Sequence, residues 1–165
     1  MEFNRLLSQA ISFYGDAGKN STQKAISKIQ YPKVNIKNYE SITSEKILDK
    51  WLDILNKQSV ISVDTETSSL NPLEANLVGV SFSYLPNKAC YIPLDHKNIK
   101  GLKKELVLKK IKKILEDSSI KKVGQNIKFD FIILKRNGIE INSIEDTMLI
   151  SSTLDAGINR HNLDT

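Results

Sequence analysis

SVISVDTETSSLN, residues 59–71, joins a short apolar run to two carboxylates. The β-branched run VISV predicts a buried β-strand, and Asp64 and Glu66 stand at its end. Side chains two residues apart on a strand point to the same face, so these two should project together while Thr65 points away. Two like charges this close repel each other or raise one pKa unless a cation lies between them. The stretch therefore predicts a strand end built for a divalent metal.

Length and composition describe an ordinary globular chain. The 165 residues suit one domain with its own core plus a short appendage, and 40% hydrophobic with 26% charged residues excludes bulk disorder. Cys90 is the only cysteine, which excludes an intramolecular disulfide and predicts a small buried hydrophobe in a reducing cytoplasm. No window approaches the roughly 18 apolar residues of a membrane span, and the N-terminus lacks a signal-peptide pattern. We expect a cytoplasmic protein with no membrane partner.

The net charge of +5 is unevenly distributed. Thirteen Lys or Arg and four Asp or Glu lie between Lys97 and Arg136. This excess would suit a polyanionic partner such as nucleic acid. Lysine is also common throughout the chain, as in a compositionally biased genome, so charge alone leaves both interpretations open.

The first half of the chain predicts an appendage and then strands. Residues 1–33 should hold a short helix over residues 3–14 and a polar, glycine-containing linker, before a main domain over residues 34–165. A short strand within residues 35–42 precedes a helix capped by Thr43 or Ser44 and running to about Asn56. Trp51 lies on the apolar face of that helix as a core anchor. Strands follow over residues 60–65, 77–84 and 88–92, and the last two form a hairpin.

The second half alternates helices and strands. An amphipathic helix covers residues 102–116, a strand residues 121–124, and a further helix runs from Asn126 or Ile127 to Arg136. A short strand within residues 139–144 and a helix capped by Asp146 complete the series. The inward face of the first of these helices is predicted to hold Leu102, Leu106, Ile111, Ile114 and Leu115. The fold class is α/β: a ribonuclease-H-like mixed sheet with a three-strand antiparallel start and then parallel βα units, flanked by helices.

A second polar motif, VGQNIKFD, spans residues 123–130. Asn126 and Asp130 are four residues apart and so share one face of a helix, from which Asp130 can reach back to the strand pair. Gln125 lies at the strand-to-helix turn, where α/β sheets commonly bind ligands. Oxygen ligands of this kind suit Mg²⁺ or Mn²⁺ rather than zinc. Asp-x-Glu pairs also occur on solvated strand ends, so spacing alone leaves a structural interpretation open.

Several segments in this order resemble one known family. They are VDTETSSL, ANLVGVSFSY, ACYIPLDH, LEDSSIKKVGQNIKFDFIIL, NGIEI, DTMLISSTL and RHNLD. Together they resemble the 3′→5′ proofreading exonuclease domain of bacterial DNA polymerase I, of the DEDD exonucleases, over residues 35–165. MEFNRLL resembles the segment that precedes this domain in those polymerases. The resemblance implies an enzyme of DNA replication and repair that uses two Mg²⁺ or Mn²⁺ ions to release nucleoside 5′-monophosphates. Its implied partners are a single-stranded DNA 3′ end and a polymerase domain in the same natural chain.

The resemblance also implies catalytic and metal-binding roles. Asp64 would bridge both metals, and Glu66 would bind the first metal near the substrate's 3′ hydroxyl. Asp130 would hold the second metal, partly through water.

Further residues would contact the substrate. Leu70 resembles an apolar wedge beside the terminal base, and Met148 a residue near that base. Gln125 and Asn126 resemble polar contacts to the terminal sugar and phosphate, and Thr65 belongs with these substrate-binding positions.

One part of the family pattern has no counterpart within the sequence. The third motif, Tyr-x-x-x-Asp, supplies the fourth carboxylate and is expected beyond Thr165, so that the domain is C-terminally incomplete. The string Tyr91-Ile-Pro-Leu-Asp95 fits the spelling, but it falls at a predicted strand end and Pro93 argues against a helical pair. We interpret it as a chance match. His96 and His161 have no partner at ligand spacing and are predicted to be structural or solvated.

Two other functions stay open at this point. One is a catalytically weak or inactive exonuclease-fold module that binds single-stranded nucleic acid or plays a structural role. The other is an RNA-trimming exonuclease of the ribonuclease D type, which shares these carboxylates.

Overall fold

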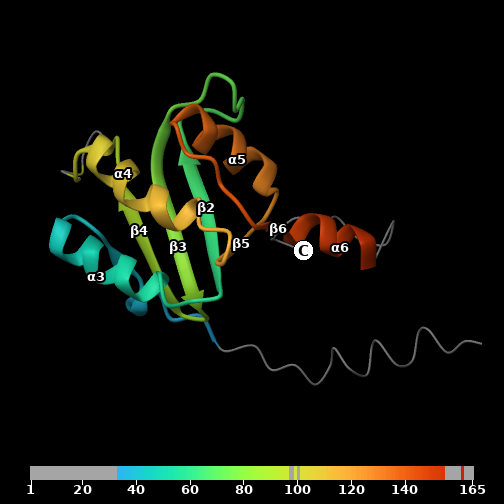
Figure 1. Cartoon of the computed structure of the whole chain (residues 1–165), viewed down its shortest axis with the longest axis horizontal. Helices are drawn as coiled ribbons and strands as arrows, with labels where there is room; N and C mark the ends of the chain where they lie inside the picture. The colour runs from blue at the N-terminus through green and yellow to red at the C-terminus, as the bar shows by residue number, and fades with distance from the viewer. Residues whose placement is uncertain (1–32, 97–98, 100, 155–160, 162–165) are drawn as a thin grey trace, which may run out of the picture. The chain divides into compact units, whose positions relative to one another are not determined.

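The computed structural model describes residues 33–96, 99, 101–154 and 161 (Figure 1). The helix predicted over residues 3–14 and the linker after it lie outside these residues. Six strands form one mixed sheet in the order β1-β4-β3-β2-β5-β6. Their bounds are β1 Glu40–Ser41, β2 Val60–Thr67, β3 Leu77–Leu85, β4 Lys88–Pro93, β5 Lys121–Gly124 and β6 Ile144–Asp146. β2, β3 and β4 pair antiparallel, whereas β1 with β4, β5 with β2 and β6 with β5 pair parallel. The predicted mixed sheet is confirmed.

Helices cover one face of this sheet. The helical elements are the 3₁₀ turn η1 Ile36–Asn38 and the helices α3 Glu45–Leu55, α4 Lys104–Leu115, α5 Ile127–Arg136 and α6 Thr147–Leu154. Buried and exposed residues alternate along β2, with Ile61, Val63 and Thr65 buried in the direction of the helices. The other face of β2 carries the exposed Asp64 and Glu66. The period-two alternation of a strand thus separates the core from the predicted metal ligands.

Two predictions about the core are confirmed. Trp51 is 6% exposed, its Nε1 donates to Glu40 Oε2 at 2.7 Å, and its ring meets Tyr84 edge-on with centroids 5.7 Å apart. Cys90 is buried, and desolvation raises the pKa of its thiol to about 12. Both side chains act as core packing groups rather than as parts of a site.

The short strand predicted within residues 35–42 is confirmed as β1, and the turn η1 precedes it. Two other element predictions need correction. On α4, Val107 rather than Leu106 belongs to the buried stripe, which continues with Ile111 and Ile114. Leu106 instead lines a groove between α3 and α4. The last strand begins at Ile144, later than predicted, because it pairs with β5.

The lysine-rich outer surface of α4 is partly neutralised within the fold. Lys110 Nζ lies 2.7 Å from Glu45 Oε1 and 2.5 Å from Asp49 Oδ1, both on α3. Lys112 pairs with Glu116 at 3.4 Å. These pairs favour a solvated helix face over a nucleic-acid surface at this position.

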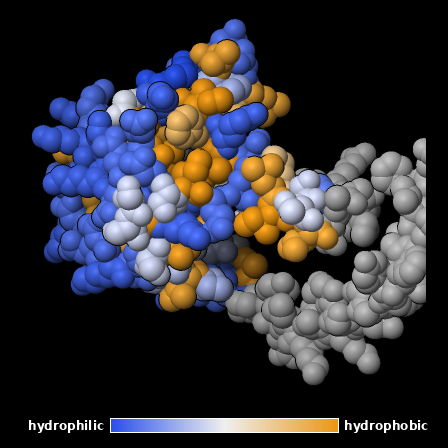
Figure 2. Space-filling model, turned by 45° about the vertical axis from the view of Figure 1, so that its right-hand side comes forward, coloured by the Kyte–Doolittle hydropathy of each residue, from blue (hydrophilic) through white to orange (hydrophobic). Residues whose placement is uncertain are grey.

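α6 carries apolar side chains on the surface. None of its residues is buried, and Leu149, Ile150 and Leu154 are exposed (Figure 2). In the described part of the chain, no helix is long and apolar enough to cross a membrane.

Candidate active site

The carboxylate pair lies near the end of β2, on the face without helices. Asp64 is paired with Ser81 of β3 and Glu66 with Gly79, and the register shifts just after Glu66. Desolvation raises the pKa of Asp64, and the neighbouring Glu66 charge raises it further. The predicted shared direction of the two side chains and the predicted electrostatic conflict are both present.

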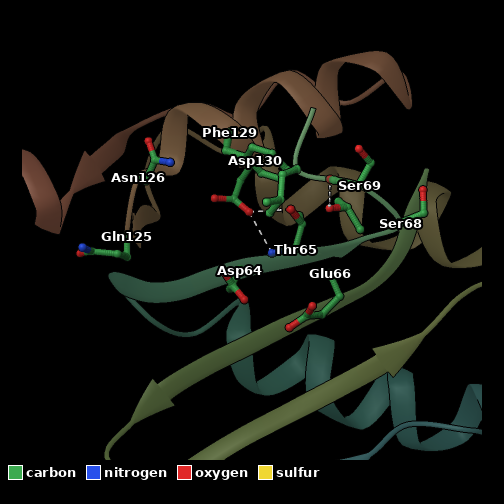
Figure 3. Close-up of a pocket in the computed structure, with 11 residues that line it drawn as sticks. Asp64, Thr65, Glu66, Ser68, Ser69, Gln125, Asn126, Phe129 and Asp130 are labelled. Atoms are coloured by element: carbon green, nitrogen blue, oxygen red, sulfur yellow. Dashed lines mark hydrogen bonds between the residues drawn. The ribbon is translucent and has the colours of Figure 1, made fainter. Parts of the chain in front are cut away.

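Asp130 approaches β2 from α5 (Figure 3). The Thr65 N–H and the Thr65 Oγ1 hydroxyl both donate to Asp130 Oδ1, at 2.8 and 2.6 Å. Asp130 is only 3% exposed, and burial raises its pKa to about 6. The Thr65 hydroxyl opposes this rise, while the Asp64 charge adds to it. Thr65 thus points away from Asp64 and Glu66, as predicted, and its direct partner is Asp130.

These groups line a pocket of about 530 Å³. Its lining residues are Asp64, Thr65, Glu66, Thr67, Ser68, Ser69, Leu70, Gln125, Asn126, Phe129 and Asp130. Seven of the eight residues predicted for the site are among them. Met148 is not among them, and its place near the terminal base stays a prediction. Among the described residues that line the pocket, the charged side chains are three carboxylates, and none is Lys or Arg.

The strand-to-helix turn is held by a carboxylate from β6. Asn126 precedes α5 with φ of 55°, a left-handed conformation that asparagine tolerates better than most residues. Its backbone N–H donates to Asp146 Oδ1 at 3.0 Å, and the same oxygen accepts from Met148 N at 2.9 Å. The predicted cap of Asp146 on α6 is confirmed, and it also fixes the start of α5.

The side-chain amide of Gln125 is held at both ends. Thr147 Oγ1 donates to Gln125 Oε1 at 2.5 Å, and Gln125 Nε2 donates to the carbonyl oxygen of His161 at 2.6 Å. The His161 ring lies 3.0 Å from Ser151 Oγ, measured from Nδ1. Gln125 therefore lines the pocket with its amide orientation fixed, and His161 has the structural role that was predicted.

Sequence reasoning gave no site role to two residues near the carboxylates. Phe129 lines the pocket beside Asp130. Tyr91 belongs to β4 and pairs with Ser81, so it shares the open face with the carboxylates. Its hydroxyl lies 2.5 Å from His96 Nε2, and burial and then the Glu66 charge raise its pKa. The strand location of Tyr91 confirms that its Tyr-x-x-x-Asp spelling is no helical motif; strand register was the signal that could have placed it on this face.

The donor set fits hard divalent cations. All three carboxylates offer oxygen, the ligand atom that Mg²⁺ and Mn²⁺ prefer. Within the described residues, no three acidic, histidine or cysteine side chains already surround one point as a formed metal centre. Asp64 and Glu66 lie on one side of β2, and Asp130 meets Thr65 on the other (Figure 3). Any ion shared by all three would therefore sit at the edge between these two sides.

Residues 39–165 match the family described as 3′-5′ exonuclease. The chain belongs to this family. It is 38% identical over 146 residues to DNA polymerase I of Rhizobium leguminosarum, covering 76% of this chain and 14% of that protein. It is 40% identical over 122 residues to DNA polymerase I of Borreliella burgdorferi, covering 73% of this chain and 13% of that protein. The chain thus spans a small part of the length of these relatives.

Solved structures of other nucleases share the fold. NrnC of Brucella melitensis matches with a TM-score of 0.55 and 25% identity, over 76% of this chain and 55% of that one. Another structure of NrnC, with a TM-score of 0.53 and 25% identity, contains bound Mg²⁺ and covers 76% of this chain and 56% of that one. RNase D of Escherichia coli matches with a TM-score of 0.56 at 19% identity, over 74% of this chain and 30% of that one. The mixed sheet is therefore the ribonuclease-H-like exonuclease fold, and the resemblance to the polymerase I exonuclease domain is confirmed.

Proposed function

We propose that this chain is the 3′→5′ exonuclease domain of a DNA polymerase I and removes nucleotides from single-stranded DNA 3′ ends. One observation carries the proposal: the charged lining residues of the pocket are Asp64, Glu66 and Asp130. A phosphodiester would meet the negative charge of these three carboxylates, so cations between them would favour its entry. Burial and neighbouring negative charge raise the pKa values of Asp64 and Asp130, and a bound cation would stabilise the charged form of both carboxylates.

Each carboxylate would have its own role in metal binding. Asp64, Glu66 and Asp130 would hold the two ions, and by the family resemblance Asp64 would contact both, with Glu66 on the first and Asp130 on the second. Both Thr65 bonds go to Asp130 Oδ1, so Oδ2 is the oxygen that would face an ion. Two Mg²⁺ or Mn²⁺ ions bound there would supply an activated water and would neutralise the leaving 3′ oxygen. The Mg²⁺ in the NrnC relative supports this cofactor class.

The remaining lining residues suit a single-stranded end. Leu70 and Phe129 offer apolar surface to the face of a terminal base, and Asn126 offers an amide to sugar or phosphate oxygens. Such contacts read backbone and base face rather than sequence. The polymerase I relatives favour DNA as the substrate and a polymerase domain in the same natural chain. A proofreading role and a cytoplasmic location belong to the same proposal. Met148 and Gln125 stay substrate-binding proposals, although α6 and His161 hold the Gln125 amide here.

Cleavage of a 5′-labelled single strand by the 165-residue chain tests the proposal. DNA and RNA of the same sequence are compared in Mg²⁺, in Mn²⁺ and in EDTA. We expect a metal-dependent DNA ladder that shortens from the 3′ end and releases nucleoside 5′-monophosphates. Asp64→Asn should slow it by about a hundredfold or more, since it removes the shared metal ligand.

Asp53→Asn is the matched control, because Asp53 is an exposed acid on α3 outside the pocket. It should leave the rate unchanged. Equal rates for wild type and Asp64→Asn would overturn the assignment of this site. Faster RNA cleavage would favour the ribonuclease D type, and salt-dependent binding without metal-dependent turnover would favour a binding module.

A further inference from the structure

Arg136 joins two parts of the molecule that border the pocket. It is the last residue of α5, the helix that carries Asp130. Its Nη1 donates to the carbonyl oxygen of Pro72 at 2.8 Å and to that of Ala75 at 2.7 Å. Both acceptors belong to the loop of residues 68–76 between β2 and β3, which we call the Leu70 loop.

The Leu70 loop is otherwise bonded to itself. Ser68 N donates to Asn76 O at 3.0 Å and Asn76 N to Ser68 Oγ at 2.9 Å, which closes its base. Asn71 O accepts from the backbone N–H groups of Glu74 and Ala75. In the described part of the chain, the other hydrogen bonds of this loop likewise join residues 67–76 to one another. The two bonds from Arg136 are therefore its hydrogen-bonded connection to α5.

The outer part of the loop has little packing to hold it. Ala75 is 2% exposed and sits in the core, but Leu70 is 95% exposed and Leu73 is 71% exposed. A segment with so little buried apolar area opens easily unless a polar contact restrains it. Leu70 nevertheless lines the same pocket as Asp130. Leu70 and Asp130 thus keep a fixed relative position only if a contact restrains the loop, and the two hydrogen bonds from Arg136 provide that contact.

We propose that Arg136 is a positioning residue that fixes the Leu70 loop against α5. The guanidinium holds the main-chain carbonyls of Pro72 and Ala75, so the side chain of Leu70 would meet a terminal base while a metal ion on Asp130 would meet the adjoining phosphate. The inference rests on the proposed function, because it assumes that a DNA 3′ end binds in the pocket. The restraint would fix where the terminal base lies relative to the scissile phosphate. Lysine, a compact charge on a flexible stem, restores this planar restraint only in part.

Lys135 offers a matched control on the same turn of α5. It has the same charge and stands equally close to the negative end of the helix dipole. Its ammonium lies 5.5 Å from the centre of the Phe131 ring, and in the described part of the chain the hydrogen bonds from α5 to the loop carbonyls come from Arg136. Lys135→Gln therefore removes one positive charge at this helix end without touching the restraint.

Amide hydrogen exchange of the free 165-residue chain tests the restraint without substrate. Arg136→Gln should speed exchange at Glu74 and Ala75 by about tenfold, because their turn is then held only by the loop itself. Arg136→Lys should fall between Gln and wild type, and Lys135→Gln should match wild type. Unchanged exchange in Arg136→Gln, or an equal rise in Lys135→Gln, would overturn the inference.

Substrate binding tests the consequence at Leu70. A single strand with 2-aminopurine at its 3′ end is bound in Ca²⁺, and its fluorescence reports the surroundings of the terminal base. Arg136→Gln and Leu70→Ala should each reduce the fluorescence change on binding. The double variant should lose no more than Leu70→Ala alone, since Arg136 acts through Leu70.

Two results separate the possible failures. Additive losses in the double variant would overturn the positioning role, because a general loss of fold would act independently of Leu70. If wild type does not bind the strand, the proposed function fails, and the exchange experiment still decides whether Arg136 holds the loop.

Discussion

Asp130→Asn is expected to stabilise the metal-free chain at neutral pH. Asp130 is 3% exposed, and its pKa of about 6 exceeds the ordinary 3.8, chiefly because burial disfavours the charged form. The folded state therefore binds the proton more tightly than the unfolded state. The free energy of unfolding must fall as pH rises from about 4 through 6, and the whole penalty is present above about pH 7. The difference between the two pKa values corresponds to about 3 kcal/mol.

Asparagine removes this penalty and keeps the local hydrogen bonds. Its Oδ1 can still accept from the backbone N–H and hydroxyl of Thr65, which now meet Asp130 Oδ1 at 2.8 and 2.6 Å. Urea unfolding in EDTA, followed by circular dichroism, should show Asp130→Asn more stable than wild type by up to about 3 kcal/mol at about pH 7.5. The two proteins should converge near pH 4, where both carry a neutral side chain.

Metal should reverse the ranking. Saturating Mg²⁺ stabilises a protein that binds it only in the folded state, so wild type should gain stability and Asp130→Asn should gain much less. Asp53→Asn, an exposed acid, should follow wild type throughout. Lower stability of Asp130→Asn than of wild type at neutral pH in EDTA, or an equal difference at pH 4 and 7.5, would show that burial of the Asp130 charge does not destabilise the fold.

Three further predictions concern the sheet and its core. A methyl group in Gly79→Ala would overlap the Tyr91 ring, so this variant should lose about 1–3 kcal/mol of unfolding free energy in urea titrations, whereas Ser81→Ala should lose little. Trp51→Phe removes the 2.7 Å bond to Glu40 and should cost about 1–2 kcal/mol in the same assay; an unchanged midpoint would show the bond to be unimportant. Cys90, buried and with its pKa near 12, should resist a disulfide reagent in the folded chain and react at once in denaturant. Rapid reaction under native conditions would contradict that burial.

Much of the architecture follows from local periodicity. The alternation of β2 predicted that Asp64 and Glu66 share a face, and β5 lies at the predicted residues. Local sequence patterns do not predict features that depend on contacts between elements far apart in the sequence. The last strand begins at Ile144 because β5 supplies its partner, and the choice of Val107 over Leu106 depends on how α4 crosses the sheet.

In the candidate site, too, the sequence predicted the features that depend on local geometry and missed those that depend on tertiary contacts. Residue spacing predicted that Asp130 lies near Asp64 and Glu66, because the geometry of a strand or a helix is set locally. The Thr65 bonds to Asp130 and the raised pKa that accompanies them depend on the depth at which α5 is buried. The contacts of Arg136 go to backbone carbonyls, which every residue carries, so no sequence pattern marks them. Tyr91 was set aside because it falls at a predicted strand end near Pro93, yet strand register places it on the carboxylate face.

Anomalous diffraction from crystals soaked in Mn²⁺ with a nucleoside 5′-monophosphate tests the central claim most directly. We expect a manganese peak in coordination contact with Asp64 and Glu66, a second ion on Asp130, and the nucleotide phosphate between them. The same soak of Asp64→Asn crystals should lose the shared ligand and weaken both peaks. Manganese absent from this pocket in well-ordered wild-type crystals, or bound only elsewhere on the surface, would contradict the account.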